Sequence, residues 1–287
     1  MALLVDYLHW DDRAWFWLKE QGVTLEQRDA SIWLPGYHAV VQARPLSGLE
    51  NDETSGLTYN PTSDTLFTVT GQHPQLVELS LAGDVLRRIP LSGFSDPEGV
   101  EVLNDGRMAI IDERRRTLTS FTLAVDALAV DAGDHASVDL GFAGAGNKGF
   151  EGIAWDGRHQ RVLLGKERGP LGLFSLPFPG EDGAVGTMQP LPAGHLFLRD
   201  ISSLTYDERT GHSLVLSDES RMLLELDADG EPRSFISLSG GMHGLNRAIK
   251  QAEGVTMDAA GNIYIIGEPN LLYMFSKEKP VVNVKAG

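Results

Sequence analysis

The 287-residue sequence contains no cysteine, which excludes disulfides, thiolate nucleophiles and cysteine-ligated zinc or iron–sulfur centres. Basic residues are scarce, 24 against 40 acidic ones, and the net charge of −16 makes nucleic acid and anionic lipid headgroups poor partners. No stretch reaches the roughly 18 consecutive apolar residues that a membrane-spanning helix needs. The G-x-S-x-G elbow of many hydrolases and the P-loop are also missing.

The first 36 residues differ in character from the rest of the chain. Residues 3–18 read LLVDYLHWDDRAWFWL and contain three of the five tryptophans. Because Trp and Tyr favour the membrane interface, we interpret residues 1–36 as a juxtamembrane linker segment whose transmembrane anchor has been removed. The alternative is an amphipathic helix that docks on its own domain. The two interpretations are compatible, since one helix can do both.

From residue 51 onward, one pattern recurs five times. Each copy has a head of alternating apolar residues, then a turn rich in Asn, Asp, Gly or Pro, then two more apolar strands. The second residue of each head falls at 56, 99, 152, 203 and 254, a period of 43 to 53 residues. The heads are SGLTY (55–59), EGVEV (98–102), EGIAW (151–155), SSLTY (202–206) and EGVTM (253–257).

This repeat predicts an all-β fold, a single five-bladed β-propeller over residues 37–287 behind a short N-terminal helical segment. The strand predicted at 37–45 precedes the first head, and we expect it to complete the last blade and close the ring. Insertions at 124–148 and 177–199 are expected to hold outer strands and loops. A sixth, degenerate blade within one of them remains the alternative.

Acidic residues recur at fixed places in the repeat. The first set stands at or just before the heads, and the second lies 14 to 16 residues after the second head residue, where a hairpin returns it to the same end of the blade. We therefore expect the acids to converge on one mouth of the central channel. The first set is Glu53, Glu98, Glu151, Asp200 and Glu253, and the second is Glu113, Glu167, Glu219 and Glu268.

Converging carboxylates repel one another, so either bound cations or interleaved bases must neutralise them. The first set predicts a divalent-cation site, with Ca²⁺ as the favoured metal because it takes six to eight oxygen ligands. The alternative is a structural ring in which Arg114, Lys166, Arg168 and Arg221 pair with the second set, and both arrangements can coexist. Bases near the heads are candidates for anion binding: Lys148, Lys166, Arg247 and Lys250.

Several strings resemble one family. TSGLTYNPTSDTLFTVT, GFEGIAWD and above all IKQAEGVTMDAAGNIYIIGEPNLLYMF are similar to the SdiA-regulated, YjiK/CarP-like bacterial family, over about residues 37–277. The resemblance implies a five-bladed propeller related to NHL-type propellers, an N-terminal membrane anchor and a calcium site. It implies no established enzymatic activity, and it links one branch to calcium homeostasis. The first and fourth repeats depart from the pattern, with Ser55 and Ser202 in place of the head glutamate.

Two functions follow from these observations. The first is a calcium-binding, membrane-tethered scaffold or sensor at the periplasmic face of the inner membrane, a monomer that engages a protein or small-molecule ligand at one propeller face. The second is a calcium-dependent, phytase-like phosphohydrolase, because DPEGVEVLNDGRMAIIDE (96–113) also resembles phytase-like propeller repeats. Dispersed basic residues favour the first, since phosphoryl transfer needs bases gathered around the phosphate.

Overall fold

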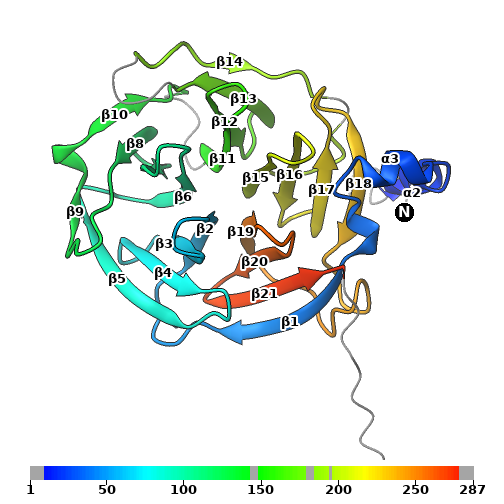
Figure 1. The fold of residues 1–287 in the computed structure, drawn as a ribbon, viewed down its shortest axis with the longest axis horizontal. Coiled ribbons are helices and arrows are strands. Elements are labelled where there is room, and N and C mark those ends of the chain that lie inside the picture. The colour runs from blue at the N-terminus through cyan, green and yellow to red at the C-terminus, as the bar shows by residue number, and fades with distance from the viewer. Residues whose placement is uncertain (1–9, 143–147, 179–183, 194–195, 278–287) are drawn as a thin grey trace, which may run out of the picture.

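The computed structural model describes residues 10–142, 148–178, 184–193 and 196–277. Five antiparallel sheets stand around a central axis, with the first strand of each repeat innermost (Figure 1). The predicted five-bladed propeller is therefore confirmed. Within the described residues, the helices are α2 (Trp10–Glu20), α3 (Leu25–Asp29), and the short 3₁₀ turns η1 (Leu34–Gly36) and η2 (Ala132–Asp134).

The blades follow the sequence repeats in order. Blade 1 holds β2 (Thr54–Asn60), β3 (Thr65–Thr70), β4 (Gln75–Ser80) and β5 (Val85–Ser92); blade 2 holds β6 (Pro97–Val102), β7 (Met108–Asp112), β8 (Thr117–Phe121) and β10 (Ala136–Asp139). Blade 3 holds β11 (Phe150–Asp156), β12 (Arg161–Lys166), β13 (Gly172–Pro177) and β14 (Gln189–Pro190). Blade 4 holds β15 (Ser203–Asp207), β16 (His212–Ser217), β17 (Met222–Leu226) and β18 (Pro232–Ser237); blade 5 holds β19 (Ala252–Met257), β20 (Ile263–Gly267), β21 (Leu271–Ser276) and β1 (His38–Pro45).

Ring closure takes place in blade 5. Strand β1 pairs with β21 in antiparallel register, with Ala39 opposite Phe275 (Figure 1). The prediction that residues 37–45 complete the last blade is confirmed, because the N-terminal strand supplies the outer edge that the C-terminal repeat lacks. The insertion at 124–148 supplies β9 (Val130–Asp131), which adds to blade 1 in parallel, and then β10; the insertion at 177–199 supplies β14.

The core consists of five apolar layers, each between two neighbouring blades. Strand β7 shows how one strand serves two layers: Met108 and Ile110 pack toward blade 1, whereas Ala109 and Ile111 pack toward blade 3. Side chains alternate across a strand, so a strand buried on both faces becomes an uninterrupted apolar run. This explains the run of four consecutive apolar residues in β7, MAII (108–111).

The N-terminal helices lie on the outside of blade 4, beside β18 (Figure 1). Phe16 packs on Phe197 and Phe235, with ring centroids 5.2 and 6.0 Å away. The Glu20 carboxylate accepts a hydrogen bond from the Phe235 backbone N–H at 2.9 Å, and Arg13 donates to the Ser220 carbonyl at 2.9 Å. One face of α2 therefore docks on the propeller and covers an edge strand. Within the described residues, no helix is long and apolar enough to span a bilayer.

The segment that joins these helices to β1 is held by one buried carboxylate. Glu225 is fully buried on β17 and accepts hydrogen bonds from the backbone N–H groups of Ile32 at 2.7 Å and Trp33 at 3.0 Å. The His212 ring lies 2.6 Å from the same carboxylate. A buried carboxylate is tolerated only when it is well hydrogen-bonded, so this contact fixes where the chain enters the last blade.

Candidate metal centre at the channel mouth

The hairpins bring both acidic sets to the same end of each blade. In blade 3, Phe150 pairs with Lys166, so Glu151 and Glu167 emerge side by side from β11 and β12. In blade 2, Pro97 pairs with Asp112, which places Glu98 beside Glu113 in the same way. The first strands line the channel, and the acids therefore surround one of its mouths.

Three head glutamates sit in β-bulges. In β6, Pro97 and Gly99 pair with the consecutive residues Asp112 and Ile111, so Glu98 is an extra, unpaired residue. The same register shift leaves Glu151 unpaired in β11 and Glu253 unpaired in β19. A bulge turns its extra residue out of the ladder and is common beside functional sites. The bulges are the local reason that these carboxylates face the channel mouth.

Glycine after the head acid lets the inner strands approach one another. A Cβ on Gly99 would lie 2.6 Å from the Glu151 carbonyl oxygen, and a Cβ on Gly254 would lie 2.8 Å from the Gly56 carbonyl carbon. Neither distance is tolerable for a real side chain. The head glycines thus permit close contact between neighbouring blades, and this contact draws carboxylates of different blades together.

Three carboxylates converge across blades 2 and 3. Glu113, Glu151 and Glu167 each offer an oxygen, and these oxygens all lie within 4.8 Å of one another. Two oxygens bound to one Ca²⁺ at about 2.4 Å can be at most about 4.8 Å apart, so the cluster fits a shared cation. It combines one residue of the first acidic set with two of the second.

The head carboxylates resist ionisation. Burial, reinforced by Asp96, Glu113 and Glu268, raises the pKa of Glu98 to about 8. Burial also raises the pKa of Glu151 well above its usual range, with Glu253, Glu167, Glu98 and Glu113 adding repulsion. The pKa of Glu253 is raised well above its usual range for the same reasons, burial first and then the surrounding acids. A cation at this mouth would remove the repulsion.

The second acidic set is partly neutralised by arginines. Arg168 hydrogen-bonds to Glu167 and, through its other amino group, to Glu219 at 2.6 Å. Arg199 forms a second ion pair with Glu219 at 2.7 Å. Bases thus interleave with acids on the side of blades 3 and 4. Glu113 instead accepts a hydrogen bond from the Gly149 N–H at 2.8 Å.

The remaining predicted acids lie around the mouth with partners of their own. Asp200 is buried and accepts from the Ser217 hydroxyl and, at 3.2 Å, from the Glu219 N–H. Glu53 accepts from the Gln72 amide at 2.8 Å, and Glu268 accepts from the Gln251 amide. These three residues are not members of the cluster.

The predicted anion-binding bases do not gather at one point. Lys166 is fully buried, and its ammonium donates to the carbonyl oxygens of Lys148 and Arg168. The side chains of Lys148, Arg247 and Lys250 are exposed. Lys166 therefore ties the loop before β11 to the turn after β12, beside the acidic cluster.

Sequence reasoning missed two residues at the channel. Arg199 pairs with Glu219, but it precedes the fourth head and follows no repeat pattern. Glu101 lies three residues after Glu98 on the channel-lining strand β6; it accepts from the Thr58 hydroxyl at 3.1 Å, and burial raises its pKa to about 8. The signal for Glu101 was available, because Thr58, Ala154, Thr205 and Thr256 occupy its place in the other heads.

Comparison with known proteins agrees with this architecture. An auxiliary nutrient-binding protein of Bacteroides thetaiotaomicron shares the fold at a TM-score of 0.53 and 9% identity, over 78% of this chain and 58% of that one. A chain of a nidogen–laminin complex matches at 0.51 and 14% identity, over 80% and 85%. A gluconolactonase of Xanthomonas campestris matches at 0.46 and 16%, over 83% and 96%.

The nutrient-binding protein and the nidogen–laminin chain share the fold alone with this chain, since their identities are low. A family model gives a more specific result. It covers the segment before β1 that is bound by Glu225, all five blades and both acidic sets. It matches residues 29–276, nearly the whole described propeller. The chain belongs to the SdiA-regulated family.

Proposed function

We propose that the protein is a calcium-binding propeller that acts as a membrane-tethered scaffold or sensor at the periplasmic face of the inner membrane, with a role in calcium homeostasis. The observation that carries the cation site is the convergence of Glu113, Glu151 and Glu167 within 4.8 Å. These three residues would hold the cation, with Glu98 and Glu253 as neighbouring charges. A bound cation would join blade 2 to blade 3.

The donor set is suited to Ca²⁺. All three ligands are carboxylates from different loops and a bulge, and Ca²⁺ accepts an irregular arrangement of oxygens, whereas Mg²⁺ demands a near-ideal octahedron. Nearby arginines are already held in ion pairs with Glu167 and Glu219. This arrangement supports binding over phosphoryl transfer, which needs bases free to meet a phosphate.

Calcium titration by calorimetry tests the proposal. We expect saturable binding of Ca²⁺ near one equivalent, with weaker binding of Mg²⁺. Replacing Glu151 by Gln removes a central ligand and should abolish measurable binding, whereas Glu231→Gln, the same change at an exposed turn of the opposite face, should leave it intact. Equal binding by both variants would exclude the Glu151 cluster as the site.

An apolar surface on the N-terminal helices supports the membrane tether. Trp15, Trp17 and Leu18 keep exposed fractions of 58%, 53% and 62%, although Phe16 between them is buried. Leu25 on α3 is 75% exposed. Exposed tryptophans beside aliphatic side chains are typical of helices that lie in a membrane interface, and the docked face of α2 would hold the propeller close to the bilayer.

Vesicle flotation measures this contribution. On net-neutral vesicles of phosphatidylethanolamine and phosphatidylcholine, we expect the full chain to float. A Trp15→Ser, Trp17→Ser, Leu18→Ser variant should bind at least about tenfold more weakly, because each apolar side chain adds about 1.5–3 kcal/mol when fully buried. The control replaces Val125 and Leu128, exposed apolar residues on a loop of blade 2, by Ser. If the control loses as much binding as the helix variant, the helices do not form the membrane contact.

A further inference from the structure

A cavity opens between blades 3 and 4, on the face opposite the acidic mouth. Its volume is about 270 Å³. The cavity lies where the β11–β12 turn meets the β17–β18 turn, and its walls include apolar side chains of both blades. The apolar lining residues are Leu163, Leu173, Leu191, Pro192, Leu226 and Ala228, and the ring of Tyr206 lies beside them.

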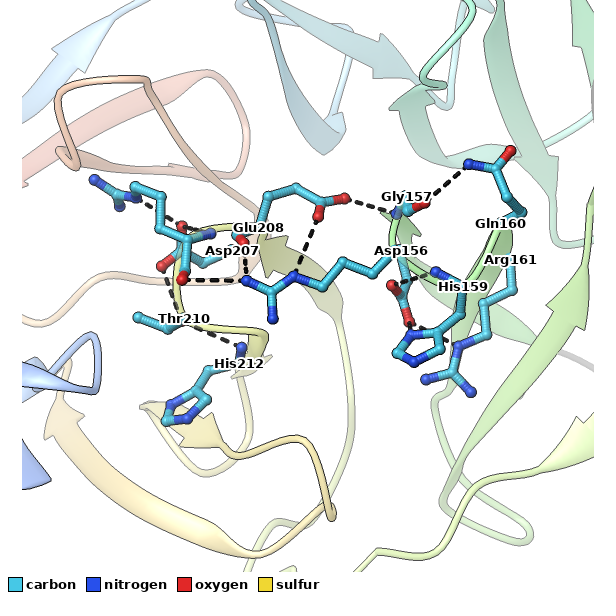
Figure 2. Close-up of polar contacts among 11 residues, drawn as sticks. Asp156, Gly157, His159, Gln160, Arg161, Asp207, Glu208, Thr210 and His212 are labelled. Carbon is cyan, nitrogen blue, oxygen red and sulfur yellow. Dashed lines mark hydrogen bonds and ion pairs between the residues drawn. The ribbon is translucent and has the colours of Figure 1, made fainter.

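Two nitrogen-bearing side chains stand at the edge of this cavity, and one buried carboxylate orients both. Asp156 is fully buried at the end of β11 and lies 2.7 Å from the Nδ1 of His159 and 2.7 Å from the Nε of Arg161 (Figure 2). Burial raises the pKa of Asp156, but hydrogen bonds from Arg161 and His159 outweigh burial and lower it. Asp156 therefore remains charged and fixes both side chains in place.

The outer ends of the two side chains are available to a ligand. Among the described residues, neither the Nη atoms of Arg161 nor the Nε2 of His159 has a hydrogen-bond partner, and both residues line the cavity. Two acids line the cavity, Asp227 and Asp229. Asp227 is already engaged, because it accepts from Arg233 and from the N–H groups of Asp229 and Glu231. Among the described contacts, neither acid forms an ion pair with Arg161. Asp156 thus occupies only the Nε of Arg161, and no carboxylate of the cavity wall is bound to the Nη atoms.

We propose that this cavity binds a small carboxylate with an apolar body, such as a medium-chain acyl carboxylate. The Nη atoms of Arg161 form the planar pair of donors that a carboxylate accepts bidentately. His159 adds a second positive charge when protonated. The leucines receive the apolar body, and an apolar cavity with a few fixed polar groups is the usual form of a ligand site. The site is independent of the proposed calcium centre.

Octanoate is a suitable probe, measured by ligand-observed NMR and calorimetry on the full chain. We expect saturable binding of octanoate, and binding at least about tenfold weaker for acetate, which lacks the apolar body, and for octan-1-ol, which lacks the charge. Equal binding of octan-1-ol would show an apolar site without carboxylate recognition and overturn the proposal. So would the absence of saturable octanoate binding.

Variants locate the site. Arg161→Met should weaken octanoate binding by about tenfold or more, and Leu191→Ser, at a partly buried wall position, should weaken it by removing apolar contact. Arg88→Met, the same change at an exposed position of blade 1, is the control and should bind as the parent does. Equal loss in the Arg88 variant would overturn the assignment. Octanoate binding should be the same with calcium and with a chelator. A negative octanoate result is therefore distinguishable from a negative result for the calcium centre.

Discussion

Calcium is expected to raise the melting temperature of the protein by about 5–10 °C at pH 8. A ligand at about 100 times its dissociation constant stabilises the native state by about 2.7 kcal/mol, and a domain of this size gains roughly 2–4 °C per kcal/mol. The cation would bind among Glu113, Glu151 and Glu167, whose oxygens already lie within 4.8 Å of one another. Differential scanning calorimetry with calcium and with a chelator measures the shift.

The shift should depend on pH in a defined direction. The pKa of Glu98 is raised from 4.5 to about 8, so between these values the native state holds a proton that the unfolded state has lost. The metal-free protein must therefore lose stability as pH rises through this window. The pKa of the proposed ligand Glu151 is raised as well, so calcium competes with a proton there and favours the ionised form of the neighbouring Glu98. The stabilising effect of calcium should therefore be larger at pH 8.5 than at pH 6.

The Glu151→Gln variant tests whether the acids at the channel mouth form a metal site or a structural ring of ion pairs. Removing one of several repelling carboxylates should raise the melting temperature of the metal-free protein at pH 8 and reduce the calcium shift. Glu231→Gln should change neither by more than about 1–2 °C, because exposed substitutions are usually within about 0.5 kcal/mol. A lower metal-free melting temperature for Glu151→Gln, with no calcium shift in the parent, would mean that these acids serve only the structure.

Deletion of residues 1–45 is expected to abolish the soluble, cooperatively folded propeller. The deletion removes β1 and leaves β21 as an open edge. It also removes five buried core residues, and at about 1.5–3 kcal/mol for each of the four large ones their loss approaches the whole stability of a typical domain. The large residues are Phe16, Ile32, Leu34 and Tyr37, and the fifth is Ala39.

The same deletion leaves Glu225 buried without the N–H groups of Ile32 and Trp33. An uncompensated buried carboxylate destabilises a protein further. Size-exclusion chromatography and thermal melting by circular dichroism measure the outcome. Deletion of residues 1–23 is the control, because it removes α2 but keeps β1 and the hydrogen bonds from Ile32 and Trp33 to Glu225. For this variant we expect a lower melting temperature with the fold retained. A monomeric 46–287 chain with a cooperative melt would show that closure by β1 is dispensable.

The five blades and their closure could be predicted from the sequence because the determining features are local. Period-two apolar alternation and turns such as NDGR (104–107) and DAAGN (258–262) specify hairpins without reference to distant residues. The strand at 37–45 was identified by its own alternation and by the edge missing from the fifth repeat. The docking face of α2 could not be predicted from the sequence, because Trp15, Phe16 and Trp17 are all large and aromatic. In the structure Phe16 packs on Phe197 and Phe235 and defines the docked face.

The candidate site was predictable in its location and less so in its membership. Repeat spacing placed both acidic sets at one mouth. It also predicted that the head acids Glu98, Glu151 and Glu253 belong to one cation site. The structure groups Glu151 with Glu113 and Glu167 instead. This grouping depends on bulges and on the approach of blade 2 to blade 3. Neither feature can be predicted from the spacing of the acids along the sequence.

The fold class, the number of blades and the accumulation of carboxylates at one end of the channel can be predicted from the sequence, since they follow from a pattern that repeats about every 50 residues. The closing strand follows from comparing the ends of the chain, because the last repeat lacks the outer strand that residues 37–45 supply. Tertiary structure alone decided which carboxylates share a space, which are paired with Arg168 and Arg199, and that Asp156 directs Arg161 toward an inter-blade cavity. Distances between neighbouring blades depend on how their facing side chains pack, and those side chains come from repeats far apart in the chain.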